Sequence, residues 1–159
     1  MMKTGRAYFL IEMKKGAVLG SELSGHTYFG GDYFGYDDGI YSALSLLKAL
    51  GSNNQSLLEI GKKLPKRAGT NELKIQVSDE EKIKIVDNVR AIIESSQEFI
   101  KILKIDGIRA YLSETGWFLV RSSGTSPYLS IRMEGKDKRE LAQVGESLDR
   151  VLSKAHLTL

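Results

Sequence analysis

The hydrophobic pattern divides the chain into two regions. In the second region, Leu73, Ile75 and Val77 alternate with polar residues as in a strand, and a helical spacing of apolar residues follows over 79–103. Three strand-like stretches and a final amphipathic helix complete it, at 107–112, 116–120, 128–133 and 136–154. The order β-α-β-β-β-α predicts an α+β domain with two helices on one face of a mostly antiparallel sheet.

The first region offers fewer strands. Its expected elements are a helix over 6–15 closed by Gly16, a buried strand at 17–19, a returning strand at 27–29, and helices from 39 to near 51 and over 56–64. Such a sheet is too small to be stable alone, because three or more strands are needed to form a buried face. The pattern therefore predicts part of an α/β domain whose first portion is not in this chain.

A polar segment separates the two regions. Residues 65–71 hold one of the chain's two prolines and have no hydrophobic periodicity, which is typical of a linker. We place a domain boundary there, with residues 1–66 in the first domain and 67–159 in the second.

The main candidate for chemistry lies between the last two strand-like stretches. It is Arg-Ser-Ser-Gly-Thr-Ser-Pro at 121–127, here called the Arg121 loop. A guanidinium, several hydroxyls and a flexible glycine at a strand-to-strand corner form a donor-rich concavity that suits a phosphate. The alternative is an ordinary hairpin loop with a surface arginine. Trp117, in the strand that leads into the loop, is expected in the core.

A second polar segment, Gly-Ser-Glu-Leu-Ser-Gly-His at 20–26, is here called the Glu22 loop. Glu22, Ser24 and His26 supply a carboxylate, a hydroxyl and an imidazole, the groups that bind sugar hydroxyls. The alternative is a solvated loop whose histidine bonds a neighbouring backbone group. Taken with the Arg121 loop, this segment suggests a sugar-phosphate site.

Two adjacent acids, Asp37 and Asp38, precede the apolar helix that starts near residue 39. Acids at a helix N-terminus complement the helix dipole and cap its free N–H groups. We interpret the pair as capping residues rather than as metal ligands.

Composition narrows the function classes. The chain of 159 residues lacks the run of about 20 apolar residues that a membrane span needs, and its N-terminus lacks the apolar core of a signal peptide. It has no cysteine, which rules out disulfides and thiolate chemistry. The net charge of +3 is spread along the chain, which disfavours nucleic acid and fits attraction of phosphorylated metabolites. We therefore expect a cytoplasmic protein with no nucleic-acid or membrane partner.

Five segments of the chain resemble the α-D-phosphohexomutases, most of all the bacterial bispecific phosphomannomutase/phosphoglucomutase type. They are Lys-Thr-Gly at 3–5, the Glu22 loop, Tyr-Phe-Gly-Tyr-Asp-Asp-Gly-Ile-Tyr-Ser-Ala at 33–43, Asp-Gly-Ile-Arg at 106–109, and Gly-Trp-Phe-Leu-Val with the Arg121 loop at 116–127. The likeness covers nearly the whole chain, in the same order and with compatible spacing.

The resemblance implies a fold and an activity. Family members have four domains around a cleft, so residues 1–66 would be the C-terminal part of the third domain, an incomplete α/β domain. Residues 67–159 would be the fourth domain, an α+β domain whose fold is likened to the TATA-binding protein. The implied ligands are hexose phosphates (glucose or mannose 1- and 6-phosphate), which the family interconverts by phosphoryl transfer.

The resemblance also implies roles for single residues. The residues that would bind sugar hydroxyls are Glu22, Ser24 and His26. Those that would hold the phosphate that is not transferred are Arg121, Ser123, Gly124 and Thr125, and possible further contacts are Lys3 and Arg6. Gly124 stands where the family usually has asparagine. The amide side chain is therefore missing, although a backbone N–H could still point at phosphate.

The groups that carry out the family's chemistry are not recognisable in this chain. In the family, the transferred phosphate resides on a first-domain serine, and Mg²⁺ is held by an aspartate-rich loop of the second domain. This sequence has no Asp-Gly-Asp-Gly-Asp run and no serine loop of that kind. We therefore expect no catalytic residue, metal ligand or bound cofactor here, and no mutase activity from the chain alone. Two alternatives stay open: a subunit of a split mutase, with the N-terminal domains supplied in trans rather than in cis, and a non-catalytic sugar-phosphate-binding module.

Overall fold

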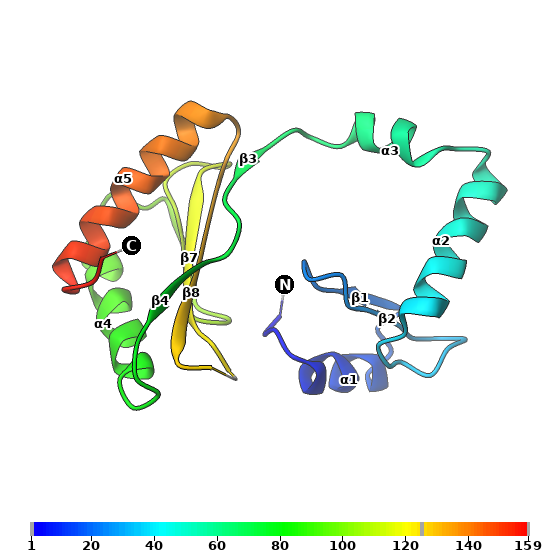
Figure 1. The fold of residues 1–159 in the computed structure, drawn as a ribbon, viewed down its shortest axis with the longest axis horizontal. Helices are drawn as coiled ribbons and strands as arrows, with labels where there is room; N and C mark the ends of the chain where they lie inside the picture. Colours follow the sequence, from blue (N-terminus) through cyan, green and yellow to red (C-terminus); the bar gives the residue numbers. More distant parts are fainter. Residues whose placement is uncertain (1, 125, 159) are drawn as a thin grey trace. The chain divides into compact units, whose positions relative to one another are not determined.

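The computed structural model describes residues 2–124 and 126–158. The chain divides into two compact units, Met1–Pro65 and Lys66–Leu159, and each is described by itself (Figure 1). The division falls one residue before the boundary expected from the polar segment at 65–71.

The second unit is a six-stranded antiparallel sheet covered on one face by two helices (Figure 1). The strand order is β3-β8-β7-β6-β5, and β4 also pairs with β8. The strands are β3 Ala68–Gly69, β4 Leu73–Gln76, β5 Lys101–Leu103, β6 Ile108–Tyr111, β7 Trp117–Ser122 and β8 Tyr128–Gly135, and the helices are α4 Lys82–Glu94 and α5 Lys138–Lys154. The predicted α+β class is confirmed.

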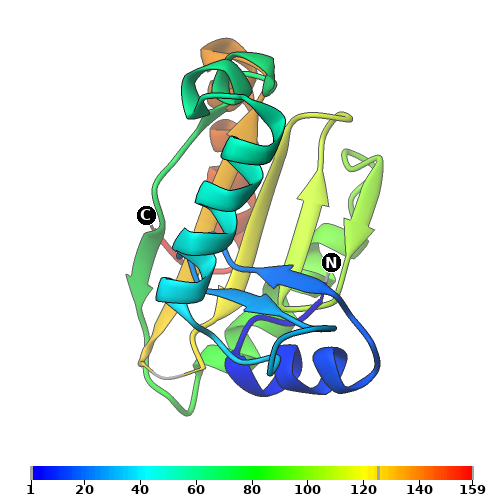
Figure 2. The same cartoon turned by 90° about the vertical axis from the view of Figure 1, so that its right-hand side faces the viewer.

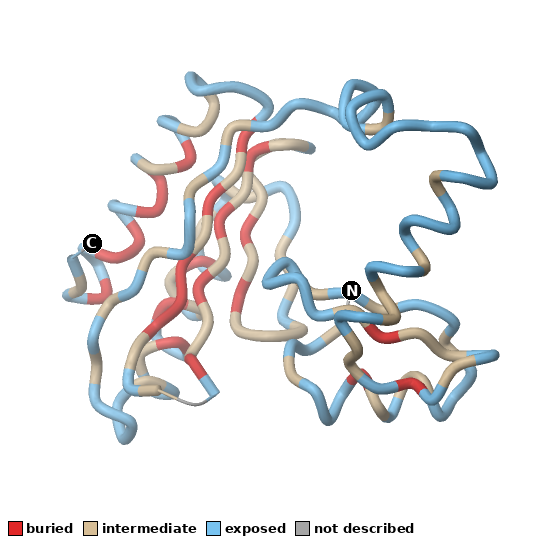
Figure 3. Tube along the Cα trace, turned by 45° about the vertical axis from the view of Figure 1, so that its right-hand side comes forward, coloured by how far each residue is buried: buried red, intermediate tan, exposed pale blue. Residues whose placement is uncertain are grey.

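The core of this unit lies between the sheet and the helices. Strands β7 and β8 contribute Phe118 and Ile131, and helices α4 and α5 contribute Ile93 and Leu148, all with no exposed surface. Figure 3 shows buried positions recurring along the strands and along the inner faces of both helices. The amphipathic helix expected near the C-terminus is confirmed, with Asp137 capping its start through the N–H of Glu140 at 2.9 Å.

The helix expected over 79–103 is too long. Helix α4 ends at Glu94, and Lys101–Leu103 forms the edge strand β5, antiparallel to β6. The serines that follow the helix explain the stop: Ser95 Oγ donates to the carbonyl of Ile92 at 2.9 Å, and Ser96 Oγ accepts from the N–H of Glu98 at 3.2 Å. Serine side chains compete in this way with the helical hydrogen bonds of the backbone.

The expectation that Trp117 lies in the core is wrong. Alternation along β7 points Phe118 and Val120 toward the helices and leaves Trp117 half-buried on the opposite face. There the guanidinium of Arg109 stacks on the indole, with 3.5 Å between its central carbon and the ring centroid.

The described residues of the first unit form three helices and one antiparallel pair of strands, seen in Figure 2 as the hairpin above α1. The elements are α1 Arg6–Lys14, β1 Leu19–Ser21, β2 Thr27–Phe29, α2 Gly39–Asn53 and α3 Leu57–Lys63. The glycine stop after α1 is confirmed: Gly16 has φ +98°, and the N–H groups of Gly16 and Ala17 bond the carbonyls of Met13 and Glu12, each at 3.0 Å.

Little of the first unit is buried. Its buried hydrophobic side chains, Phe9 and Tyr28, stack with ring centroids 4.5 Å apart. The strand expected at 17–19 begins only at Leu19 and is not buried: Leu19 is 59% exposed, and Val18 before it is 72% exposed. Helix α2 contains no buried residue, and its apolar stripe at Ile40, Leu44 and Leu47 is at least 61% exposed (Figure 3).

Within the part of the chain that the structure describes, no helix is both long and apolar enough to cross a membrane.

Candidate functional site

The Glu22 loop is the turn of the β1–β2 hairpin. Its first residues, Gly20 and Ser21, belong to β1, and Ser21 pairs with Thr27 of β2. The N–H of Glu22 donates to the carbonyl of His26 at 2.9 Å, which closes the loop. Gly25, at φ +95°, donates its N–H to the carbonyl of Glu22 at 3.0 Å. The left-handed backbone at this position favours glycine.

Glu22 and Ser24 lie together. Glu22 Oε1 accepts the N–H of Gly5 at 3.0 Å, and Glu22 Oε2 accepts the hydroxyl of Ser24 at 3.3 Å. One carboxylate therefore ties the loop to the residue that precedes α1. Because a carboxylate has about four acceptor positions, these two bonds leave room for ligand donors.

His26 is held by a residue that the sequence reasoning did not connect to it. Its Nδ1 lies 2.6 Å from Oδ2 of Asp37, whose Oδ1 accepts the N–H of Thr27 at 3.3 Å. This contact fixes the ring and leaves Nε2 as the other polar atom of an imidazole that is 56% exposed. The capping role expected of Asp37 belongs to Asp38 alone. Nothing in the local sequence signals an Asp37–His26 contact, because ten residues separate them along the chain.

Asp38 caps α2 as expected. Its Oδ1 accepts the N–H of Tyr41 at 2.9 Å, and its Oδ2 accepts the hydroxyl of Tyr33 at 2.5 Å. The Tyr33 hydroxyl and the Tyr41 N–H together hold the pKa of Asp38 below its ordinary value, while the same carboxylate raises the pKa of Tyr33.

The possible contacts Lys3 and Arg6 lie on either side of Gly5, whose N–H donates to Glu22. Burial and the nearby carboxylates of Asp37 and Glu22 raise the pKa of Tyr28, and Arg6 acts in the opposite direction. The ammonium of Lys3 lies 5.8 Å from the centroid of the Tyr8 ring.

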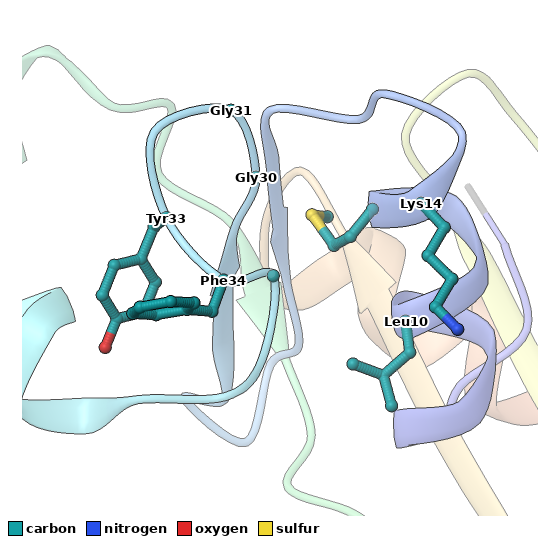
Figure 4. A pocket seen from close by; sticks show the side chains of 8 residues that line it. Leu10, Lys14, Gly30, Gly31, Tyr33 and Phe34 are labelled. Atoms are coloured by element: carbon teal, nitrogen blue, oxygen red, sulfur yellow. The ribbon is translucent and has the colours of Figure 1, made fainter.

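A shallow pocket of 210 Å³ lies beside the loop that follows β2. Figure 4 shows Leu10 and Lys14 of α1 on one side and Tyr33 and Phe34 on the other. None of the expected site residues lines it, so the candidate sugar site is the hairpin loop rather than this pocket.

The Arg121 loop is the turn of the β7–β8 hairpin. Arg121 and Ser122 end β7, and Ser122 pairs with Leu129 of β8. The loop is braced from inside: the N–H of Ser123 donates to the carbonyl of Tyr128 at 3.0 Å, and Ser123 Oγ accepts the N–H of Ser126 at 3.2 Å. These bonds link Ser123 to Tyr128 and to Ser126 before any ligand binds.

The four residues expected to hold phosphate differ in their exposure and in their hydrogen-bond partners. Arg121 is 25% exposed, and its Nη1 lies 3.6 Å from Oδ2 of Asp106. Ser123 is 5% exposed and serves as the internal brace. Gly124 is exposed, and a Cβ added there would meet nothing within 4 Å. Thr125 lies outside the described residues.

Lys82 is a residue near the loop that the sequence reasoning missed. Its Nζ donates to the carbonyl of Ser126 at 3.5 Å and pairs with Asp79 at 2.6 Å. Only the β4–β8 pairing brings the start of α4 close to the β7–β8 turn, so no local pattern could identify it.

Among the residues that the structure describes, no group of three or more acids or histidines could hold a metal ion.

Two family models together match most of the chain. The model of phosphoglucomutase/phosphomannomutase α/β/α domain III matches residues 1–68, and the model of the C-terminal domain of the same enzymes matches residues 72–151. The chain belongs to the phosphoglucomutase/phosphomannomutase family. The domain III match contains the Glu22 loop, and the C-terminal domain match contains the Arg121 loop.

Individual members of the phosphoglucomutase/phosphomannomutase family agree with this assignment. The chain is 37% identical over 145 residues to a phosphomannomutase/phosphoglucomutase of Pseudomonas syringae pv. tomato, covering 91% of this chain and 30% of that protein. It is 38% identical over 141 residues to a phosphoglucosamine mutase of Methanocaldococcus jannaschii, covering 86% of this chain and 30% of that protein.

A crystal structure of a phosphoglucomutase/phosphomannomutase family protein from Burkholderia thailandensis superposes with a TM-score of 0.83 and 31% identity, covering 98% of this chain and 32% of that one. The chain thus spans about a third of the length of the family members that it matches.

Proposed function

We propose that this chain supplies the substrate-recognition part of a phosphohexomutase that interconverts hexose 1-phosphate and hexose 6-phosphate. The Arg121 loop holds the phosphate that stays on the sugar, and the Glu22 loop binds the sugar's hydroxyls. The observation that carries the proposal is the half-buried guanidinium of Arg121, fixed at the end of β7 beside a braced hairpin turn.

The chemistry of the Arg121 loop suits a phosphate monoester. A guanidinium presents several N–H donors in one plane and can bond two phosphate oxygens at once. The turn is closed by its own hydrogen bonds, so less freedom is lost on binding than in an open loop. The open space beside Gly124 leaves access to the loop backbone.

The chemistry of the Glu22 loop suits a pair of neighbouring hydroxyls. Each sugar hydroxyl can donate to the Glu22 carboxylate and accept from the Ser24 hydroxyl. The two side chains already lie in contact at 3.3 Å, and the anchored ring of His26 offers a third polar group from the same loop.

We further propose that phosphoryl transfer depends on polypeptide corresponding to the rest of the longer relatives, in cis or in trans. That polypeptide supplies the phosphorylated serine and the Mg²⁺ site, while this chain binds and orients the hexose phosphate. The support is that the matched relatives are about three times as long as this chain.

Calorimetric titration of the chain with glucose 1-phosphate tests the binding proposal. We expect binding by the wild type and its loss in Arg121→Ala. Arg139→Ala, which removes the same charge from the exposed start of α5, is the matched control and should bind as the wild type does. Equal heats from the wild type and Arg121→Ala would overturn the assignment of the loop.

A mixing experiment tests the proposed place of the chemistry. The chain alone should not convert mannose 1-phosphate to mannose 6-phosphate. Addition of the part of a bispecific relative that precedes its segment matching this chain, expressed separately, should restore conversion, and failure to do so would exclude action in trans. Turnover by the purified chain alone would contradict the proposal.

A further inference from the structure

We propose that the Asp106–Gly107 turn positions Arg121 for phosphate and that Asp106 is a positioning residue for this site. The inference rests on the proposed function of the Arg121 loop. The turn lies between β5 and β6, next to the end of β7. It begins the Asp-Gly-Ile-Arg segment at 106–109, to which the proposed function gives no role.

Gly107 allows the turn to press against the backbone of Arg121. The pairing of Ile108 with Val120 places Gly107 beside the end of β7. A Cβ on Gly107 would lie 2.3 Å from the carbonyl oxygen of Val120 and 2.7 Å from Cα of Arg121. Gly107 also has φ +73°, a left-handed conformation that favours glycine. Any side chain here would force the turn away from Arg121.

This close approach places the Asp106 carboxylate beside the Arg121 guanidinium. Asp106 Oδ2 lies 3.6 Å from Nη1, and both side chains are half-buried, at 30% and 25% exposed. A guanidinium has five N–H donors in a fixed plane, so a carboxylate beside one nitrogen leaves the others for a ligand. Asp106 can therefore limit the rotamers of Arg121 without occupying its whole binding edge.

A second acid faces Arg121 from the other side. Arg121 pairs with Ser130 across the β7–β8 ladder, and Ser130 Oγ donates to Glu72 Oε1 at 2.6 Å. The Ser130 hydroxyl is the main cause of the lowered pKa of Glu72, and Lys74 and Arg121 lower it further. Carboxylates from two different loops, the β5–β6 turn and the segment before β4, therefore interact electrostatically with Arg121.

Asp106 has two effects on phosphate binding, and they have opposite signs. Its negative charge repels a phosphate, so by charge alone its removal would strengthen binding. As a brace it holds the guanidinium in one orientation, so its removal would weaken binding because that ordering must then occur on binding. We expect the second effect to dominate, since the pair is half-buried and the turn is fixed by backbone contact.

The decisive variant is Asp106→Asn, with Asp149→Asn on the exposed side of α5 as the control for the same change in charge. Titration of the full chain with glucose 1-phosphate should show affinity about threefold to fivefold weaker for Asp106→Asn, the scale of losing one partly exposed ion pair. Asp149→Asn should match the wild type or bind slightly tighter. Equal or tighter binding by Asp106→Asn would overturn the inference.

Nuclear magnetic resonance of the free chain gives a readout that does not need a ligand. The Arg121 Nε–Hε group should show a lower heteronuclear NOE, meaning more motion, in Asp106→Asn and in Gly107→Ala, but not in Asp149→Asn. Unchanged motion in Asp106→Asn would refute the positioning role. If the wild type and Arg121→Ala both fail to bind glucose 1-phosphate, the proposed function fails instead, and the NOE still decides whether Asp106 orders Arg121.

Discussion

Both units of the chain contain helices with apolar side chains, but they bury these side chains very differently. In the second unit, α5 packs on a six-stranded sheet, and Val144 and Leu148 have no exposed surface. In the first unit, α2 is more apolar overall and less sharply amphipathic than α5, yet its Leu44 and Leu47 are 61% and 64% exposed. An amphipathic pattern therefore predicts a helix, whereas burial requires a layer of sufficient size for the helix to cover.

The same difference applies to the two candidate binding loops. The Arg121 loop joins two central strands of a sheet with its own core, and internal bonds brace its turn. The Glu22 loop joins a two-stranded hairpin, and its order depends on a few polar contacts, from Glu22 to Gly5 and from His26 to Asp37. We expect the Arg121 loop to be more fully formed in this chain than the Glu22 loop.

The largest contrast between the units should come from large-to-small substitutions. Phe118→Ala removes a fully buried ring and should lower the free energy of unfolding of the second unit by about 3–5 kcal/mol. Leu44→Ala removes an exposed side chain of α2 and should change stability by less than about 0.5 kcal/mol. Urea unfolding measures both, followed by the fluorescence of Trp117, the chain's single tryptophan, and by far-ultraviolet circular dichroism. A loss above about 1 kcal/mol in Leu44→Ala would mean that α2 is covered in solution.

A smaller effect, with a defined pH dependence, is expected at Glu140 of α5. Its carboxylate accepts the N–H of Lys136 and the hydroxyls of Ser113 and Thr115, and these bonds lower its pKa from 4.5 to about 2. Because the folded-state pKa is below the unfolded value, the stabilisation is present above pH 4.5 and is lost as the pH falls toward 2.

Glu140→Gln should therefore lower the free energy of unfolding by about 1–2 kcal/mol at pH 7. This is at the lower end of what hydrogen bonds to a charged group contribute, because the side chain is partly solvated. The difference in the free energy of unfolding between wild type and variant should be smaller at pH 3. Urea unfolding at the two pH values checks this, with Glu146→Gln on the exposed face of α5 as the control. A difference in the free energy of unfolding that stays constant with pH would show that the charge of the Glu140 carboxylate does not contribute to stability.

In the first unit, the corresponding test is the cap of α2. Asp38→Ala removes the acceptor for the Tyr41 N–H and for the Tyr33 hydroxyl, so amide exchange at the first turn of α2 should accelerate several-fold. Asp32→Ala, in the exposed loop that precedes it, should leave those rates unchanged. Hydrogen exchange measured residue by residue gives the comparison, and equal acceleration in both variants would rule out a specific cap.

The smallest effect is expected at Gly124. A Cβ there meets nothing within 4 Å and φ is not positive, so Gly124→Asn should leave the urea midpoint unchanged. The added amide is expected to leave affinity for glucose 1-phosphate intact or to increase it. Weaker binding by this variant would indicate that phosphate approaches the bare backbone of the loop.

Much of the fold followed from the sequence because the decisive signals are local. The period of apolar residues located α5 and strands β6 to β8, and Gly16 and Asp38 marked helix ends through backbone chemistry that involves only neighbouring residues. The β5 strand was missed because its three residues fit the tail of a helical pattern as well, and the pairing with β6 that decides between them is not local.

The site followed from the sequence only in part. The two loops could be located from their polar residue types, and the family resemblance assigned them roles. The residues that support them could not be found in this way: Asp37 meets His26 through the hairpin, and Asp106 meets Arg121 through the sheet. These contacts depend on strand order, which a single sequence does not encode in any short pattern.

Residue-resolved nuclear magnetic resonance of the full chain, titrated with glucose 1-phosphate, tests the central claim most directly. We predict that chemical-shift changes concentrate at residues 121–127 and at Asp106 and Gly107, with smaller changes at 22–26, and that Arg121→Ala removes those at the Arg121 loop. Shift changes that avoid this loop, or that persist unchanged in Arg121→Ala, would contradict the account.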